Sequence, residues 1–376
     1  MTSPLLILEL FGIAISFAVI PLGYLYFNRR IDFFSKLNWA LVFFTFDLIL
    51  FGAFTRLSDS GLGCPDWPGC YGSSNPFKAL EQIQIAEQAM PNGPVTVFKA
   101  WVEMIHRYLA MGVGALILTQ VILAWRQRKQ LGNKALMGSL FLLTLVSLQG
   151  AFGAWTVTLR LQPIIVSAHL LLALFLFACL TWYAQKNQTV IGASDKTESI
   201  FKHSKISARL LSFAAGVLVI QLFLGAWVST NYAVLACPDF PTCLGQWYPP
   251  TDWQHSFYLW RDLGQTKTGE SLSMTSLVTI HWTHRATAIF AATALIYLAI
   301  RAYATRNPNL VFWAKCLMIL LSLQIVTGIS NVVFQWPLLA ALMHTGGAAG
   351  LVFCLTRMSA WSTCSFLAVD NSGRKV

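Results

Sequence analysis

Nine apolar segments, each long enough to cross a membrane, run along this chain of 376 residues. A transmembrane helix needs about 20 apolar residues to span a hydrocarbon core about 30 Å thick. Only 11% of the residues are charged, against roughly 25% in a typical soluble domain, so a soluble fold could not cover its surface. The sequence predicts an all-α polytopic membrane protein with spans near 4–27, 37–56, 98–125, 135–158, 163–185, 208–230, 275–300, 311–334 and 338–360.

Basic residues mark alternate connections between the spans and indicate an orientation. By the positive-inside rule these connections lie in the cytoplasm, so the N-terminus and the connections 57–97 and 231–274 face outward, and the C-terminus is cytoplasmic. The net charge of +11 then reflects membrane orientation, and no nucleic-acid partner is expected. The first span lacks a strongly basic start and a cleavage site, so we expect it to be retained. The basic residues are Arg29, Arg30, Lys36, Arg126, Arg128, Lys129, Lys134, Lys186, Lys196, Lys202, Lys205, Arg209, Arg301, Arg306, Arg374 and Lys375.

Four landmarks recur in the same order about 175 residues apart: a Cys-Pro-Asp-x-Pro-x-Cys loop, a His-Arg pair, a Ser-Leu-Gln-x-x-x-Gly segment and a lone histidine. The repeat predicts a duplicated four-helix unit, covering 37–186 and 208–360, behind an extra N-terminal helix and link (1–36), with a cytoplasmic linker (187–207) and tail (361–376). Because each unit has an even number of spans, both insert the same way, and their pseudo-two-fold axis should follow the membrane normal. The landmarks begin at Cys64, His106, Ser147 and His169, and again at Cys237, His284, Ser322 and His344.

Histidines inside the spans are the strongest functional signal, because an ionisable side chain is costly in hydrocarbon. His106 and His169 lie at similar depth on separate helices, and the second half repeats this with His284 and His344. Zinc would require three or four ligands, whereas haem brings four equatorial nitrogens and needs only an axial pair. We therefore expect two bis-histidine haem sites in the outer leaflet, although a hydrogen bond between helices is the alternative for any single histidine. The histidines outside the spans, expected to be ordinary exposed side chains, are His203 and His255.

The halves differ three residues before the histidine of the His-Arg pair, where the first has Glu103 and the second has His281. A spacing of three keeps both side chains on one helix face, so Glu103 should point toward whatever His106 binds. A buried carboxylate beside a bound ring can move protons or polarise water; a hydrogen bond to a neighbouring helix is the alternative. The difference favours chemistry in the first half and electron transfer in the second.

Arginines form a second group of candidates. Arg107 and Arg285 directly follow the two histidines and point about 100° away from them around the helix. They could clamp carboxylates such as haem propionates or pair with another buried group, and the sequence favours neither. Arg56 is a third candidate for the same support.

The eight cysteines fall into two groups. Four lie in the outward loops, where an oxidising compartment preserves disulfides, and the repeat favours Cys64–Cys70 and Cys237–Cys243 among the three pairings that four cysteines allow. Each bridge closes a short loop and could be structural or redox active. The others lie in or beside spans, where a small buried side chain is the ordinary interpretation: Cys179, Cys316, Cys354 and Cys364.

These motifs together resemble those of haem A synthases, membrane enzymes that convert haem O to haem A for cytochrome oxidases. The resemblance covers about 37–360 and rests on the order and duplication of the motifs as well as on their residues. That family usually has eight spans, so the first apolar segment is a departure. The matching segments are Thr55–Cys70 (TRLSDSGLGCPDWPGC), Glu103-x-x-His106-Arg107, Ala168-His169-Leu170, Ala236–Pro241 (ACPDFP), His284-Arg285 and His344.

The resemblance implies a division of labour between the halves. Haem O, the substrate, would lie between His106 and His169, and haem b, a resident cofactor, between His284 and His344. Glu103 would be catalytic, and the first loop's cysteine pair would take part in turnover. The implied reaction oxidises a ring methyl group of haem O to a formyl group, with oxygen from water, in a bacterial inner membrane. The partners would be haem O synthase, an unidentified electron donor or acceptor and the lipid bilayer, and a homo-oligomer is compatible with the sequence.

Three other functions are compatible with parts of this pattern. A dihaem cytochrome that only relays electrons, for example to or from quinone, explains the histidines but not the exchange of Glu103 for His281. A thiol–disulfide oxidoreductase would use the outer cysteines and treat the histidines as structural. A parallel-repeat transporter is suggested by the duplication alone, but it would need a path to both sides, whereas the polar groups cluster in one leaflet.

Overall fold

The computed structural model describes residue 27 and residues 32–188 and 206–363. Within these residues eight helices are long and apolar enough to cross a membrane, and there is no strand. The chain is therefore an all-α polytopic membrane protein, as predicted; the first predicted span, 4–27, lies outside the described residues. The eight helices are α2 (Phe33–Leu57), α4 (Val97–Arg126), α6 (Asn133–Thr158), α7 (Pro163–Lys186), α9 (Ala208–Thr230), α11 (Met274–Ala304), α12 (Pro308–Val333) and α13 (Leu338–Thr363). Shorter helices are α3 (Leu80–Ala89), α5 (Arg128–Leu131) and α10 (Trp253–Ser256).

Local sequence sets where several of these helices begin. Asp32, Thr96 and Ser273 precede α2, α4 and α11, and their side chains accept hydrogen bonds from backbone N–H groups of the first turn. Such caps satisfy N–H groups that have no partner inside the helix. Pro163 and Pro308 are the first residues of α7 and α12, a position where the missing N–H of proline removes no helical hydrogen bond.

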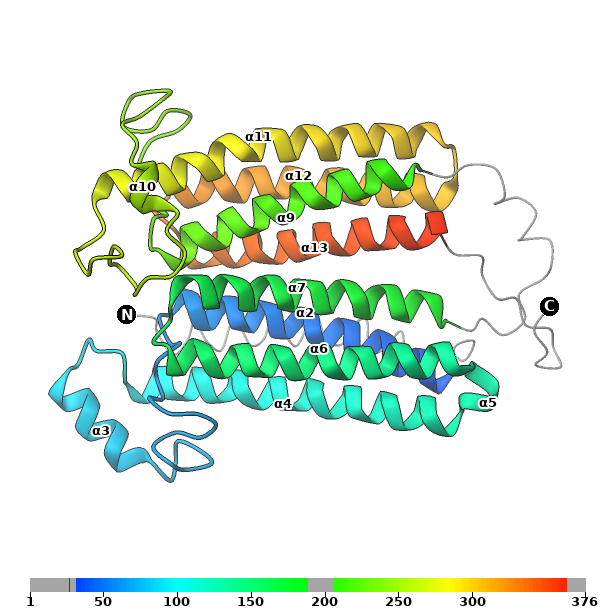
Figure 1. Ribbon diagram of the computed structural model, residues 1–376, viewed down its shortest axis with the longest axis horizontal. Coiled ribbons are helices and arrows are strands. Elements are labelled where there is room, and N and C mark those ends of the chain that lie inside the picture. The colour runs from blue at the N-terminus through cyan, green and yellow to red at the C-terminus, as the bar shows by residue number, and fades with distance from the viewer. Residues whose placement is uncertain (1–26, 28–31, 189–205, 364–376) are drawn as a thin grey trace.

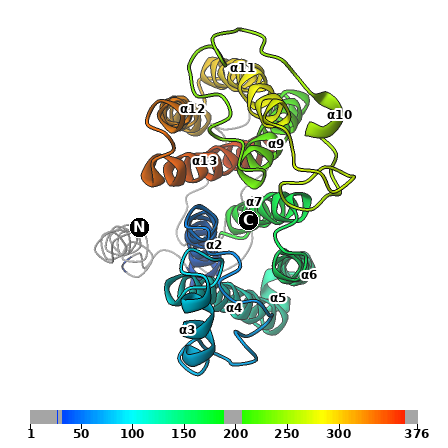
Figure 2. The same cartoon turned by 90° about the vertical axis from the view of Figure 1, so that its left-hand side faces the viewer.

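The helices form two four-helix groups that meet along one side (Figure 1, Figure 2). Neighbouring helices contact one another around the ring α2–α4–α6–α7 in the first half, and around the ring α9–α11–α12–α13 in the second. The halves meet through α2 with α13, α7 with α9, and α7 with α13. In the duplicated unit α2 corresponds to α9, and α7 corresponds to α13. The contact of α2 with α13 is therefore equivalent to that of α9 with α7, and the α7–α13 contact is equivalent to itself, as a two-fold relation between the halves requires.

Each half buries an apolar core among its own four helices. Leu41, Ile117 and Leu142 lie in the core of the first half, and Leu298 and Leu310 in that of the second. Buried polar groups need partners inside the protein, because hydrocarbon supplies none. Such pairs are Gln120 with Asn38 (2.8 Å) and Tyr183 with Ser139 (2.7 Å).

The two long connections lie at the same end of the bundle (Figure 1). The first contains α3, whose Ile83 packs with the cysteines of that loop and with Met104 of α4. The second contains α10, where the backbone carbonyl of Ser256 accepts a hydrogen bond (2.9 Å) from the indole N–H of the fully buried Trp227. Both connections are therefore seated on the helices beneath them.

Replacing Leu142 by alanine should destabilise the protein, because this α6 side chain is 1% exposed and packs in the first core. Removing a buried leucine side chain costs roughly 2–5 kcal/mol. The matched control is Leu140→Ala on the same helix, where the side chain is 39% exposed. Thermal unfolding in detergent should give a clearly lower midpoint for Leu142→Ala than for Leu140→Ala, and equal midpoints would contradict the assigned core.

Candidate functional site

Four histidines, one each from α4, α7, α11 and α13, define two candidate sites at the end of the bundle that carries the long connections. His106 and His169 form the first histidine pair, and His284 and His344 form the second. Within each pair the imidazoles are close enough to interact electrostatically. The structure therefore brings together the histidines that the sequence predicts to act together. Of the other three histidines, His281 is buried on α11, His255 is exposed and lies 3.0 Å from Asp252, and His203 is outside the described residues.

A glycine on the neighbouring helix faces the first histidine of each pair. A Cβ atom built on Gly52 of α2 would lie 3.0 Å from Cε1 of His106, and one built on Gly225 of α9 would lie 3.0 Å from Cε1 of His284. This is tighter than an ordinary van der Waals contact, so a side chain at either position would press on the ring. Glycine therefore lets the helix backbone approach the imidazole closely, and both halves repeat the arrangement.

The Ser-Leu-Gln-x-x-x-Gly segments of α6 and α12 hold the second histidine of each pair. In both halves the glutamine amide donates to the backbone carbonyl of the histidine, and the glycine faces its imidazole. The motif thus contributes two contacts to one residue, one turn apart on the same helix face. The contacts are Gln149 to the His169 carbonyl (3.1 Å), Gln324 to the His344 carbonyl (2.7 Å), and Cβ positions on Gly153 and Gly328 at 3.3 Å from Cε1 of His169 and His344.

In the second half, hydrogen bonds orient both imidazoles. Nδ1 of His284 lies 3.1 Å from the amide nitrogen of Gln221, whose oxygen accepts a hydrogen bond from Thr287 (2.7 Å). Nδ1 of His344 lies 3.0 Å from the hydroxyl of Thr327. A hydrogen bond at one ring nitrogen fixes the direction in which the other nitrogen points. Both rings of the second pair are therefore held by polar contacts as well as by packing.

The equivalent positions of the first half are all apolar. The first half has Leu48 in place of Gln221, Leu109 in place of Thr287 and Phe152 in place of Thr327. His106 stacks instead on Phe51 of α2, with 6.2 Å between the ring centroids and 7° between the ring planes. The Nδ1 atom of His106 is buried and has no hydrogen-bond partner in the described part of the chain. In the first pair, therefore, His106 is held by packing, whereas the His169 ring keeps one polar contact, with its Nε2 lying 3.3 Å from the amide nitrogen of Gln149.

Each outer loop is closed by a disulfide and capped by an aspartate. Asp66 accepts hydrogen bonds from the two backbone N–H groups after Cys70, and Asp239 does the same after Cys243. Hydrogen bonds from Thr242 and from those N–H groups lower the pKa of Asp239 to about 2, so this cap remains ionised at neutral pH. The disulfides are Cys64–Cys70 and Cys237–Cys243, the pairing that the repeat favours.

Arg107 and Arg285 attach these loops to the histidine-bearing helices. The sequence leaves open whether these arginines clamp haem propionates or pair with another buried group. In the structure both guanidinium groups point to the backbone of the loops. Charged donors of this kind make stronger hydrogen bonds than neutral ones. Arg107 donates to the carbonyls of Asp66, Pro68 and Gly69, and Arg285 to those of Cys237, Asp239 and Thr242.

Glu103 connects the first disulfide loop to α4. Its carboxylate is buried and accepts hydrogen bonds from the backbone N–H of Cys64 (2.8 Å) and from Arg107 (2.6 Å). At the equivalent position, His281 accepts a hydrogen bond from Nε of Arg285 (3.2 Å). The first half thus places a carboxylate beneath its disulfide where the second places an imidazole, and both Glu103 oxygens have partners in or next to the loop.

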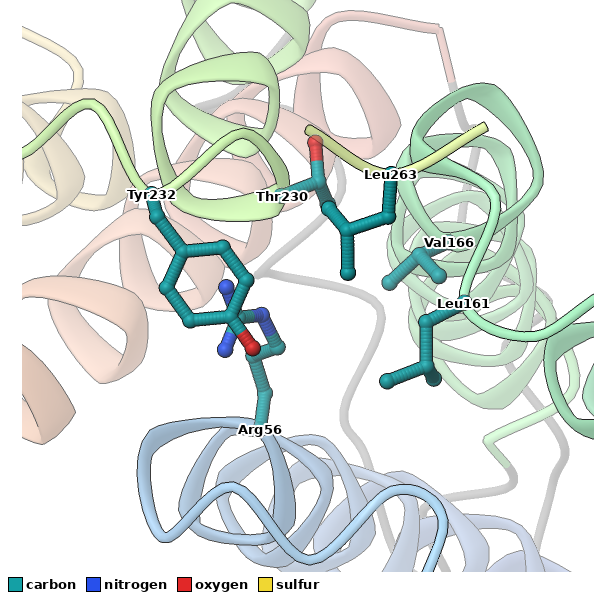
Figure 3. Close-up of a pocket in the computed structure, with 6 residues that line it drawn as sticks. All are labelled: Arg56, Leu161, Val166, Thr230, Tyr232 and Leu263. Carbon is teal, nitrogen blue, oxygen red and sulfur yellow. The ribbon is translucent and has the colours of Figure 1, made fainter. Parts of the chain in front are cut away.

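Arg56 lies one turn beyond Gly52 on α2, where the two halves meet (Figure 3). Its guanidinium donates to the backbone carbonyl of Ser229 and lies 4.1 Å from the ring centroid of Tyr232. The hydroxyl of Tyr232 donates in turn to Asp59 (2.7 Å). Arg56 therefore joins the halves and borders a hollow of about 200 Å³, which includes space open to the outside. The lining residues are Arg56, Leu161, Val166, Thr230, Tyr232 and Leu263.

Several residues of the site are absent from the sequence-based expectations. Gly52, Gly225 and Gln221 contact the histidines, but their residue types alone do not distinguish them from other small or polar residues in a span. The repeat does carry a signal, since Gly52 and Gly225 keep the same offset as the cysteine loops. Gln149 of α6 and Gln324 of α12 mark the repeat in the sequence, and in the structure they bind the backbone carbonyls of His169 and His344.

Two similar four-helix halves, each enclosing a histidine pair beneath an arginine-anchored disulfide loop, define a class of polytopic membrane protein with duplicated histidine sites. The family model described as "Cytochrome oxidase assembly protein" (COX15-CtaA) matches residues 35–356. The chain belongs to this family.

Curated relatives that match along most of the chain bear the name haem A synthase. The protein of Shewanella oneidensis is 36% identical over 329 residues, which cover 86% of this chain and 96% of the relative. That of Sphingopyxis alaskensis is 32% identical over 338 residues, covering 84% and 87%. That of Paracoccus denitrificans is 25% identical over 343 residues, covering 85% of each.

Arg285→Gln should loosen the second outer loop, because it removes the charged donor that binds three backbone carbonyls. A loss of about 1.4 kcal/mol of local stability corresponds to about tenfold more frequent opening. We expect a water-soluble phosphine to reduce Cys237–Cys243 about tenfold faster in this variant, as counted by alkylation and peptide mass spectrometry. Arg301→Gln, at an exposed position on α11, is the matched control. An unchanged rate in Arg285→Gln would show that the arginine does not hold the loop.

Proposed function

We propose that this chain is a haem A synthase, which oxidises a ring methyl group of haem O to the formyl group of haem A. Membership of the family and the names of the relatives support the activity. The observation that carries the proposal is the contrast between two histidine pairs on one duplicated scaffold. A protein that only relayed electrons between equivalent haems would not need that contrast.

The residues of both pairs are suited to haem. Haem needs only an axial pair from the protein, and when bound its iron would supply the redox chemistry. Nδ1 of His106 and Nδ1 of His169 have no hydrogen-bond partner among the described residues, and Nε2 of His169 lies 3.3 Å from the amide nitrogen of Gln149, so each first-half ring keeps one nitrogen available. In the second half, His284 and His344 use Nδ1 for their polar contacts, which leaves Nε2 available. We assign haem O to the first pair and haem b to the second.

The surroundings of the histidines support this division. A resident cofactor benefits from ligands held in one orientation, and hydrogen bonds to the second ring nitrogen provide this. Gln221 and Thr327 are placed to do so in the second half. A substrate site must release its product, and the apolar neighbours of His106, including Phe51 and Leu48, impose no such polar restraint. The second half is therefore the better site for haem b.

Glu103 is the side chain that we assign to proton transfer in the first half. It stands three residues before His106, and Arg107 together with the Cys64 N–H holds its carboxylate in place. Oxidation of a methyl group with oxygen from water releases protons and electrons, so a carboxylate that polarises water or accepts a proton is needed. The Cys64–Cys70 disulfide fixes the loop from which that N–H comes, and this links the cysteine pair to turnover.

The electrons released must reach an acceptor, which we expect to dock at or near the outer end of the bundle, and haem O must arrive from a haem O synthase. The relatives are bacterial, and the chain is a multi-pass membrane protein. We place it in the inner membrane with its N-terminus in the periplasm, its C-terminus in the cytoplasm and both histidine pairs in the outer leaflet, following the positive-inside rule.

The activity is tested by extracting haems from membranes of cells that make haem O, with and without this gene. The proposal predicts that haem A appears only when the gene is present and that haem O falls correspondingly. A dihaem electron carrier would leave the haem types unchanged while adding haem b. Equal haem A in both membranes would contradict the proposal.

Glu103→Gln should abolish conversion while leaving haem binding nearly intact. The amide keeps an oxygen that can accept from Cys64, but it cannot take up a proton or pair by charge with Arg107. General acid–base groups typically contribute a factor of about 10²–10⁴, so haem A yield should fall by at least about a hundredfold. Glu81→Gln on the exposed face of α3 is the control. Haem A yield would be followed by chromatography, and a normal yield from Glu103→Gln would rule out the role.

Gly225→Val should displace His284, because even the Cβ atom would lie 3.0 Å from the imidazole. Disturbing the orientation of a metal-binding histidine typically lowers affinity by a factor of 10–100, so purified protein should retain about tenfold less haem b. Gly216→Val on the same helix is the matched control, since nothing lies within 4 Å of its Cβ position. The haem b content of each variant is measured from the visible absorption spectrum of the reduced pyridine–haem complex. Equal haem b in both variants would refute the assignment of haem b to His284 and His344.

A further inference from the structure

A second polar site lies at the opposite end of the bundle from the histidines. Arg357 of α13 stands between two tryptophans, Trp39 of α2 and Trp313 of α12. Its guanidinium carbon is 4.9 Å from the ring centroid of Trp39 and 5.0 Å from that of Trp313. A guanidinium over an indole face is attracted by the negative face of the ring. The contacts join α2 of the first half to α12 and α13 of the second.

The charge of Arg357 has no counter-ion in the part of the chain that the structure describes. Among those residues it forms no ion pair, and its Nε and Nη1 atoms are enclosed without a hydrogen-bond acceptor. Arg357 is only partly buried, and Nη2 is neither fully enclosed nor hydrogen-bonded within the described residues, so this edge of the guanidinium is the accessible one. Arginine stays protonated in proteins. The open edge therefore presents a full charge, with its other faces covered by the indoles.

All three residues lie within two turns of the helix ends, at the end of the bundle remote from the disulfide loops. Trp39 is six residues from the start of α2, Trp313 five from the start of α12, and Arg357 six from the end of α13. At 1.5 Å per residue this is about 9 Å from the helix ends, on the side that the positive-inside rule places in the cytoplasm. Tryptophan is enriched at the membrane–water interface, and a long arginine side chain can extend its head toward that interface.

We propose that Arg357, Trp39 and Trp313 form a binding site for an anionic phospholipid of the cytoplasmic leaflet, with the lipid phosphate on Nη2 of Arg357. Guanidinium groups make strong charge-assisted hydrogen bonds to phosphate. Basic sites between transmembrane helices on the cytoplasmic side are suited to anionic headgroups, because that leaflet is negatively charged. A lipid here would contact helices of both halves and hold them together at the end remote from the disulfide loops.

Native mass spectrometry of the purified full-length protein tests the site by titration with phosphatidylglycerol or with phosphatidylcholine. Wild-type protein should bind one phosphatidylglycerol about tenfold more tightly than phosphatidylcholine, which corresponds to about 1.4 kcal/mol. Arg357→Gln should lose this preference, whereas Arg357→Lys, which keeps the charge, should retain part of it. Arg301→Gln is the matched control, because it removes an exposed charge in the last turn of α11 at the same end of the bundle.

Three results would overturn the proposal. If wild-type protein shows no preference for phosphatidylglycerol over phosphatidylcholine, the proposal is wrong, and this result does not depend on whether the variants fold. An unchanged preference in Arg357→Gln would place the lipid elsewhere. Displacement of phosphatidylglycerol by millimolar inorganic phosphate would assign the site to a free anion instead of a lipid.

Discussion

Five imidazoles are packed inside the membrane-spanning helices, and this governs how the helices and loops of the protein are arranged. Hydrocarbon contains no water to solvate a ring nitrogen, so the protein, or what it binds, must provide every contact. Glycines on adjacent helices let the backbones approach the rings, and the glutamines of α6 and α12 bind the histidine carbonyls. Arg107 and Arg285, next to the first histidine of each pair, fasten the outer loops above them. Duplication provides this whole arrangement twice.

The two copies keep the same backbone contacts and differ in the side chains around the rings. The second half uses Gln221, Thr287 and Thr327 to hold its imidazoles, and the first half has apolar residues in their place. Within the described residues, the first half alone has a carboxylate on its histidine-bearing helix, Glu103, bound to its disulfide loop. In the function that we propose, one scaffold holds a cofactor firmly in one half and exchanges and converts a substrate in the other, and the two halves differ at a few positions rather than in fold.

Much of this architecture follows from the sequence, because hydrophobic length and the repeat are properties of the chain itself. The eight spans within the described residues, the grouping of the four histidines and the disulfide pairing could be predicted in this way, whereas the predicted span 4–27 lies outside the described residues. The roles of Gly52, Gly225 and Gln221 could not, since they depend on which helices become neighbours. The direction of Glu103 was only partly predictable. Helix periodicity places it on the same face as His106, but the bonds from Arg107 and the Cys64 N–H depend on how the loop folds back over α4.

The central claim is that the two histidine pairs hold haems of different type and permanence. The most direct test is the haem content of the purified full-length protein, measured by type and by amount per chain with chromatography and pyridine complexes. We expect about one haem b per chain that persists through purification, together with smaller and variable amounts of haem O and haem A. Protein without any haem absorbance, or with two equivalent and equally retained haems b, would contradict the central claim.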